Sequence, residues 1–183
     1  MENKFMEKEE YKINFEKAEG YLKKGNFNQA IREFETVLEK WPDDPRCYNK
    51  LGVCYASLRD FIKAKSYLEK ASVLNPKYPE PYNNLGNICL EEKEYEKSIE
   101  LYKKALELNS DYSAAHSNLG LAYKRTKRIN EAVIHFKRAA EIDRKAPLSE
   151  VKKIRMKTKT KNNIIIFILI LVGLIILWFL LKK

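Results

Sequence analysis

The chain repeats itself every 34 residues over most of its length, and no other feature constrains its fold as much. Four consecutive blocks align without an insertion, and they span residues 11–44, 45–78, 79–112 and 113–146. Matching fragments open the last three blocks: YNKLGVCYA, YNNLGNICL and HSNLGLAYK. A fixed period of this length indicates an array in which each unit packs mainly on its neighbours.

Each block holds two runs of apolar residues at helical spacing, separated by a short break. In the third block the two runs are Tyr82, Leu85, Gly86, Cys89, Leu90 and then Ile99, Tyr102, Ala105, Leu106, Leu108. The alternation of a β-strand is absent from the sequence. Pro45 and Pro79 stand where helices are expected to begin, since proline fits the first turn. The pattern predicts a stack of four helical hairpins.

These features resemble the tetratricopeptide repeat family. The period, the aromatic–x–x–Leu–Gly opening and the alanine and aromatic of the second run all match, and the block PEPYNNLGNICLEEKEYEKSIELYKKALELNSDY is nearly a consensus repeat. Asn14, Lys17 and Arg144 depart from the pattern in the first and last blocks, as expected for the ends of an array. The resemblance implies an all-α, right-handed superhelical solenoid of four hairpins. The sequence after the repeats predicts, in addition, a short capping helix and one C-terminal transmembrane helix.

Charge is distributed unevenly along the chain. Residues 147–183 carry 8 of the 35 Lys and Arg but only 1 of the 25 Asp and Glu, so the repeats themselves are nearly balanced. The positive net charge therefore does not indicate nucleic-acid binding. Residues 1–10 form a charged segment without the apolar core of a secretion signal. The odd number of scattered cysteines favours free thiols in a reducing compartment.

The segment after the repeats predicts membrane attachment. Residues 164–181 contain eighteen uncharged residues, sixteen of them Ile, Leu, Phe or Val, which is typical of a transmembrane helix. The preceding basic residues are Lys152, Lys153, Arg155, Lys157, Lys159 and Lys161. Because basic residues favour the cytoplasmic side, we expect a single-pass, tail-anchored protein with its repeats in the cytoplasm, in a bacterial inner membrane or a eukaryotic organelle membrane. The basic residues serve as a topology signal, or also contact anionic lipid.

Residues 147–163 join the repeats to this span. Leu148, Val151 and Ile154 lie three residues apart, which would place them on one side of a short helix. We expect this helix to cover the exposed face of the fourth unit, before the basic linker.

The resemblance also implies a groove, lined by the first helix of each hairpin, that binds proteins or peptides. The groove candidates are Asn49, Val53, Asn83, Asn87, Leu90, Ser117, Leu121 and Lys124. Asparagine amides can hydrogen-bond a peptide backbone, although they also occur on ordinary helix surfaces. A clamp for a C-terminal carboxylate is not expected, since its positions would be Phe15, Glu19, Lys50, Glu80, Asn84 in one register and Asn49, Val53, Asn84, Ala114, Asn118 in the other, which supply too few cations.

No motif in the sequence indicates catalysis, a metal site or a cofactor. His116 and His135 are interpreted as packing residues of the fourth unit. The turn of the third unit is acidic and that of the fourth is basic, which predicts cross-unit ion pairs or, alternatively, a basic surface for an acidic partner or lipid. We therefore expect a membrane-anchored interaction scaffold that recruits or assembles cytosolic partners. Alternatives are a tail-anchored organelle receptor similar to the mitochondrial fission adaptors and, in another class, a membrane-bound enzyme subunit.

Overall fold

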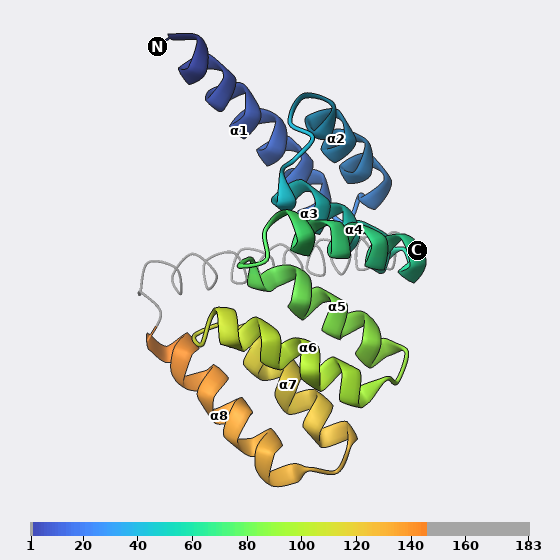
Figure 1. The fold of residues 1–183 in the computed structure, drawn as a ribbon, viewed down its shortest axis with the longest axis vertical. Coiled ribbons are helices and arrows are strands. Elements are labelled where there is room, and N and C mark those ends of the chain that lie inside the picture. The colour runs from blue at the N-terminus through green and yellow to red at the C-terminus, as the bar shows by residue number, and fades with distance from the viewer. Residues whose placement is uncertain (1, 146–183) are drawn as a thin grey trace, which may run out of the picture. The chain divides into compact units, whose positions relative to one another are not determined.

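The computed structural model describes residues 2–145, with side chains from residue 9 onward, and forms an all-α array of helical hairpins (Figure 1). Its helices are α1 (Glu2–Lys23), α2 (Phe27–Lys40), α3 (Pro45–Ser57), α4 (Phe61–Leu74), α5 (Pro79–Glu91), α6 (Tyr95–Leu108), α7 (Ser113–Arg125) and α8 (Ile129–Lys145). The prediction of an all-α solenoid of helical hairpins is thus confirmed. The charged segment at the start of the chain contributes the first turns of α1.

Several predictions concern residues that the structure does not describe. The capping helix, the basic linker and the transmembrane helix all fall within residues 147–181. Among the helices of residues 2–145, none combines the length and the apolar character needed to cross a bilayer.

The sequence sets the helix boundaries locally. Pro45 and Pro79 occupy the first turns of α3 and α5, where a backbone N–H would have no acceptor within the helix, so proline loses no hydrogen bond there. The Asp44 carboxylate accepts a hydrogen bond from the backbone N–H of Arg46 at 2.8 Å, and that of Asp60 accepts one from Lys63 at 3.1 Å. These side chains satisfy backbone donors that the first turn of a helix leaves unpaired.

Within each pair, the two helices approach at a small residue of the first helix. A Cβ atom added at Gly52 would lie 2.5 Å from Leu68 Cγ, one at Gly86 would lie 2.6 Å from a Tyr102 ring atom, and one at Gly120 would lie 2.8 Å from the Phe136 ring. The close approach is therefore present in three successive pairs. Leu68 and Tyr102 also pack against the next pair, in clusters with Leu85 and with Leu119.

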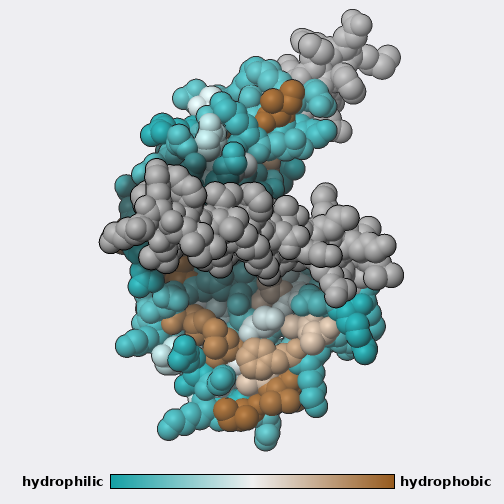
Figure 2. Space-filling model, turned by 180° about the vertical axis from the view of Figure 1, so that it is seen from behind, coloured by the Kyte–Doolittle hydropathy of each residue, from teal (hydrophilic) through white to brown (hydrophobic). Residues whose placement is uncertain are grey.

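Adjacent pairs share a continuous core. One cluster joins Ile99 and Tyr102 of α6 to Leu119 and Tyr123 of α7, so the second helix of one pair packs on the first helix of the next. Val133 and Phe136 of α8, which correspond to Ile99 and Tyr102, are partly exposed to solvent. Figure 2 shows more hydrophobic surface over the C-terminal pairs than over the N-terminal ones on the face that it draws.

Candidate functional site

The first helices α3, α5 and α7 contact one another in sequence and form one surface of the array. The structure places the predicted groove residues on this surface to different depths. Asn49 and Asn83 are each only 4% exposed. Val53, Asn87, Leu90, Ser117 and Leu121 are half-buried, and Lys124 is exposed.

Asparagine side chains on these helices form a hydrogen-bonded ladder. Asn118 donates from Nδ2 to Asn83 Oδ1 at 2.9 Å, and Asn83 donates to Asn84 at 3.4 Å. Asn84 donates to Asn49 Oδ1 at 2.9 Å, and Asn49 donates to the Tyr78 hydroxyl at 3.3 Å. The amides of Asn49 and Asn83 thus connect neighbouring units, and their contact with a bound peptide stays a prediction.

A second set of contacts crosses between first helices on the more exposed side. Lys50 forms an ion pair with Glu19 at 2.6 Å, between α3 and α1. Two repeats further along the chain, at the equivalent positions, Asn118 of α7 donates to Asn87 Oδ1 of α5 at 2.9 Å. The intermediate pair in this register is Val53 and Asn84, and Val53 has no polar group to bond.

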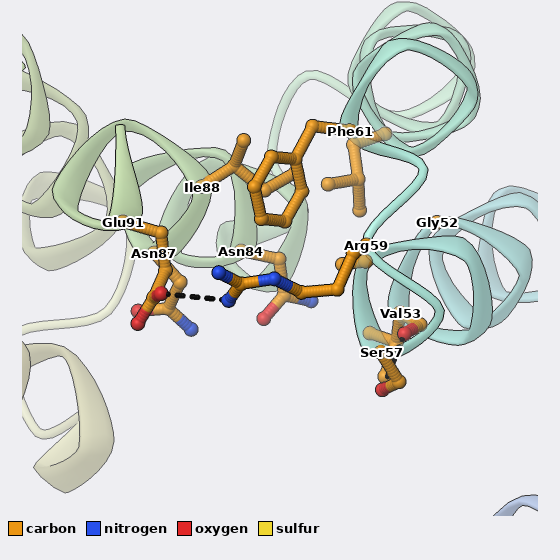
Figure 3. Close-up of a pocket in the computed structure, with 11 residues that line it drawn as sticks. Gly52, Val53, Ser57, Arg59, Phe61, Asn84, Asn87, Ile88 and Glu91 are labelled. Atoms are coloured by element: carbon orange, nitrogen blue, oxygen red, sulfur yellow. Dashed lines mark hydrogen bonds and ion pairs between the residues drawn. The ribbon is translucent and has the colours of Figure 1, made fainter.

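A cavity of about 360 Å³ lies at this interruption, between α3 and α5 (Figure 3). Its apolar wall consists of Val53, Leu68, Phe61 and Ile88 together with Gly52 and Ala56, and its polar rim consists of Asn84, Asn87, Ser57, Arg59 and Glu91. Figure 3 shows Arg59 reaching from its turn toward α5, where its guanidinium bonds the Glu91 carboxylate at 2.9 Å. Neither Leu68 nor Arg59 was among the predicted groove residues.

The charged turns pair across units in part. Glu91 and Glu92 bond Arg59 and Lys65 of the preceding unit, the latter at 2.6 Å, while Arg128 reaches Glu96 at 4.0 Å. The predicted cross-unit pairing between the acidic and basic turns is therefore limited to this last, long contact. Within the described part of the chain, Lys124, Arg125 and Lys127 form no ion pair.

The two histidines meet between α7 and α8. Their Nδ1 atoms are 2.9 Å apart, and His116 Nε2 lies 3.1 Å from the Ser110 carbonyl oxygen. Burial, followed by the charges of His116 and Lys103, lowers the pKa of His135. In residues 2–145 no group of three or more His, Cys, Asp or Glu could hold a metal ion. The two rings also stack on each other, with their centres 5.2 Å apart.

The three cysteines are buried free thiols. Burial raises the pKa of Cys54 to about 11 and that of Cys47 to about 12. A thiol attacks as its thiolate, so these side chains are poor nucleophiles at neutral pH. They belong to the core of the array.

Three family models match parts of the repeat region. Models described as tetratricopeptide repeats match residues 15–79 and 113–146, and a model described as TPR repeat matches residues 86–127. The human Superkiller complex protein 3 is 37% identical over 57 residues, which are 31% of this chain. The chain spans only 4% of the length of that relative.

Several solved structures have a similar fold. MamA is 27% identical with a TM-score of 0.62, covering 74% of this chain and 79% of its own. PilF of Pseudomonas aeruginosa is 24% identical with a TM-score of 0.68, covering 75% and 63%. The first TPR of Spaghetti (RPAP3), solved with the HSP90 peptide SRMEEVD, is 23% identical with a TM-score of 0.58, covering 64% and 93%. The helical hairpins of this chain are tetratricopeptide repeats.

Proposed function

We propose that the array is a protein-interaction scaffold that binds an extended segment of a partner along the surface of α3, α5 and α7. The observation that carries this proposal is the cavity between α3 and α5, which lies on the same surface as the half-buried Asn87 and Leu121. A cleft with apolar walls and a few polar groups suits a ligand that needs both burial and orientation. The peptide bound to the Spaghetti repeats supports the same mode of use.

The partner is not held by a terminal carboxylate. Lys50 is the one cation at the clamp positions of either register, and its ammonium already bonds Glu19. Although burial opposes ionisation of Glu19, the ion pairs with Lys50 and Lys23 outweigh it and lower its pKa. The carboxylate thus stays ionised and keeps Lys50 engaged. We therefore propose that the array recognises the side chains of the partner segment and not its terminal carboxylate.

We further propose that residues 164–181 hold this scaffold at a membrane. The run is long enough to span a thin bilayer, and it is free of charged residues. The basic residues at 152–161 place the repeats on the cytoplasmic side and lie where anionic headgroups attract lysine and arginine. On this proposal, the scaffold recruits or assembles cytosolic partners at the bilayer.

Site-specific photo-crosslinking in cells tests the binding surface. A benzophenone amino acid replaces Leu121, which is half-buried on α7, and the matched control replaces Val73, which is 75% exposed on α4. We expect discrete partner adducts from position 121 and none from position 73. Equal adduct patterns from both positions would contradict binding along the first helices.

Removal of residues 164–183 tests the anchor separately. We expect the full chain to sediment with membranes and to resist extraction by carbonate or high salt. The shortened chain should appear in the soluble fraction as a helical protein. Membrane association that persists after the deletion would refute the proposed span.

A further inference from the structure

We propose that the cavity between α3 and α5 is an anchor site for one aliphatic side chain of an extended partner segment, and that this segment carries acidic residues toward α7. The inference rests on the proposed scaffold function and narrows the chemistry of its partner. It is drawn from a comparison of equivalent positions in the four units.

The cavity exists because one position differs in the second unit. Position 34 of the first unit corresponds to positions 68, 102 and 136, and the residues there are Phe34, Leu68, Tyr102 and Phe136. Three units thus have an aromatic ring where the second has a smaller leucine. Leu68 and its counterparts Tyr102 and Phe136 pack on a glycine of the same pair, so the backbone geometry around them is alike.

The third unit shows what would otherwise fill the space. The Tyr102 ring passes Gly86 and its hydroxyl donates to Asn87 Oδ1 at 2.8 Å, on the exposed side of α5. Asn87 corresponds to Val53, and both Leu68 and Val53 line the cavity. The volume between these two side chains is therefore the place that the outer part of the Tyr102 ring occupies one repeat later.

The side-chain bond that joins neighbouring first helices elsewhere is absent at the Val53 register. Glu19 with Lys50, and Asn87 with Asn118, join neighbouring first helices on either side of it. At the same register, Val53 leaves Asn84 to bond Asn49 deeper in the interface. Among the units that the structure describes, no side-chain bond therefore joins α3 and α5 at the Val53 register, and the ion pair between Arg59 and Glu91 crosses the same step beside the cavity (Figure 3).

The chemistry of the walls selects an aliphatic side chain. Val53, Phe61 and Ile88 give the cavity an apolar wall that favours burial of a leucine or methionine side chain, and the Arg59 guanidinium lies 5.3 Å from the centre of the Phe61 ring. Asn87 accepts two hydrogen bonds through Oδ1, whereas its Nδ2 has no partner in the described residues. That N–H group is available to the carbonyl of an extended backbone.

The charge around the cavity indicates acidic flanking residues. Glu91 on its rim is neutralised by Arg59, and the residue one repeat further is Arg125, which has no ion pair within residues 2–145. Lys124 is its exposed neighbour and is likewise unpaired. Neighbouring packed helices lie about 10 Å apart, which about three extended residues span. An acidic residue at that distance from the anchor would reach Arg125.

Peptide selection on the full chain tests the inference. The chain is embedded in phospholipid nanodiscs, and a phage-displayed library of random dodecapeptides is selected on it against empty nanodiscs. Enriched peptides are synthesised with a fluorescent label, and their dissociation constants are measured by anisotropy. We expect them to share a Leu, Ile, Met or Val with Asp or Glu two to four residues away.

Two substitutions close the cavity from different sides. Leu68→Phe introduces the residue that the first and fourth units carry, and Val53→Tyr fills the cavity from its half-exposed rim. Each should weaken binding at least tenfold, and replacing the shared aliphatic residue of the peptide by Ala should give the same loss on the wild type and no further loss on Leu68→Phe. Val73→Tyr adds equal bulk on α4 and should leave binding unchanged. Circular dichroism checks that each variant folds. If Leu68→Phe does not fold, binding to Val53→Tyr decides the result.

A separate variant tests the proposed contact between Arg125 and an acidic residue of the partner. Arg125→Glu should weaken binding several-fold, and a peptide with Lys in place of its acidic residues should recover that loss. Undiminished binding to Leu68→Phe and Val53→Tyr, or enriched peptides without an aliphatic residue, would overturn the anchor site while leaving the scaffold function intact. If no peptide is enriched over empty nanodiscs, the scaffold function fails and the anchor site fails with it.

Discussion

At the scale of single residues, the turns inside the hairpins repeat one backbone conformation. Gly25, Arg59, Lys93 and Lys127 lie 34 residues apart and all have φ between 62° and 79°. This left-handed conformation costs roughly 1 kcal/mol or more for a residue with a Cβ atom, and much less for glycine. The first unit meets the requirement with glycine, and the other three meet it with exposed long side chains.

Two glycines of the first unit allow this effect to be measured without a change in packing. A Cβ atom at Gly20 or at Gly25 would meet nothing within 4 Å. Gly25→Ala should lower the free energy of unfolding by about 1 kcal/mol, because alanine is strained at positive φ. Gly20→Ala, inside α1, should raise it by about 0.5–1 kcal/mol through helix propensity. Urea denaturation followed by circular dichroism measures both, and shifts of the same sign would contradict the explanation.

The histidine contact predicts a pH dependence of the fourth unit. The pKa of His135 is lowered by burial and by the facing His116 and Lys103, so the native state resists its protonation. This group therefore contributes stability that is full above the ordinary histidine pKa of 6.5 and is lost as the pH falls toward the lowered native value.

We expect the free energy of unfolding, and amide exchange protection in α7 and α8, to fall between pH 7 and pH 5. His135→Leu is the matched variant, because Leu101 holds the corresponding position of the third unit. It should keep the fold and lose this part of the pH dependence. An identical decline in both proteins would assign the effect to other groups.

At the scale of the helices, hydrogen bonds between asparagines fix how one first helix lies against the next. Asn118 is the donor to both Asn83 and Asn87. Asn118→Ala would leave two partly buried acceptors without that donor, which should lower the free energy of unfolding by about 1–2 kcal/mol. Asn118→Asp should lower the free energy of unfolding further at neutral pH, because a carboxylate would face two amide oxygens.

Thermal and urea unfolding of the two variants test this order. Asn130→Ala, at an exposed position of α8, is the control for a general loss of asparagine and should change stability by less than about 0.5 kcal/mol. If the aspartate variant is as stable as the alanine variant, the side-chain ladder does not set the contact between α5 and α7.

Sequence periodicity predicts the helices but not which polar side chains they bury. The 34-residue period and the prolines at 45 and 79 locate helix starts to the residue, because those signals act locally. Burial of Asn49 and Asn83 depends on the asparagines of the next helix, so apolar periodicity does not detect it. The cavity depends on a difference between units, because Leu68 is smaller than its counterparts Tyr102 and Phe136. That difference can be recognised in the sequence only when equivalent positions of the units are compared.

At the scale of the whole array, each unit gains stability from the unit that follows it. Ile99 and Tyr102 of α6 are 2% and 0% exposed under α7, whereas Val133 and Phe136, their counterparts on α8, are 43% and 39% exposed. In an array whose stability is a sum of units and interfaces, the pair with the less buried face opens first.

Truncation at equivalent positions measures this difference directly. Tyr102→Ala removes a fully buried ring with a hydrogen-bonded hydroxyl and should cost about 3–5 kcal/mol. Phe136→Ala removes a ring that is already 39% exposed and should cost about half as much, since less surface returns to water. Hydrogen exchange should show weaker protection in α8 than in α5 and α6 of the wild type. Phe136→Ala should reduce protection in α7 and α8 alone, while Tyr102→Ala should reduce it in α5 to α8. Equal costs at the two positions, with uniform loss of protection, would mean that the four hairpins unfold as one cooperative unit.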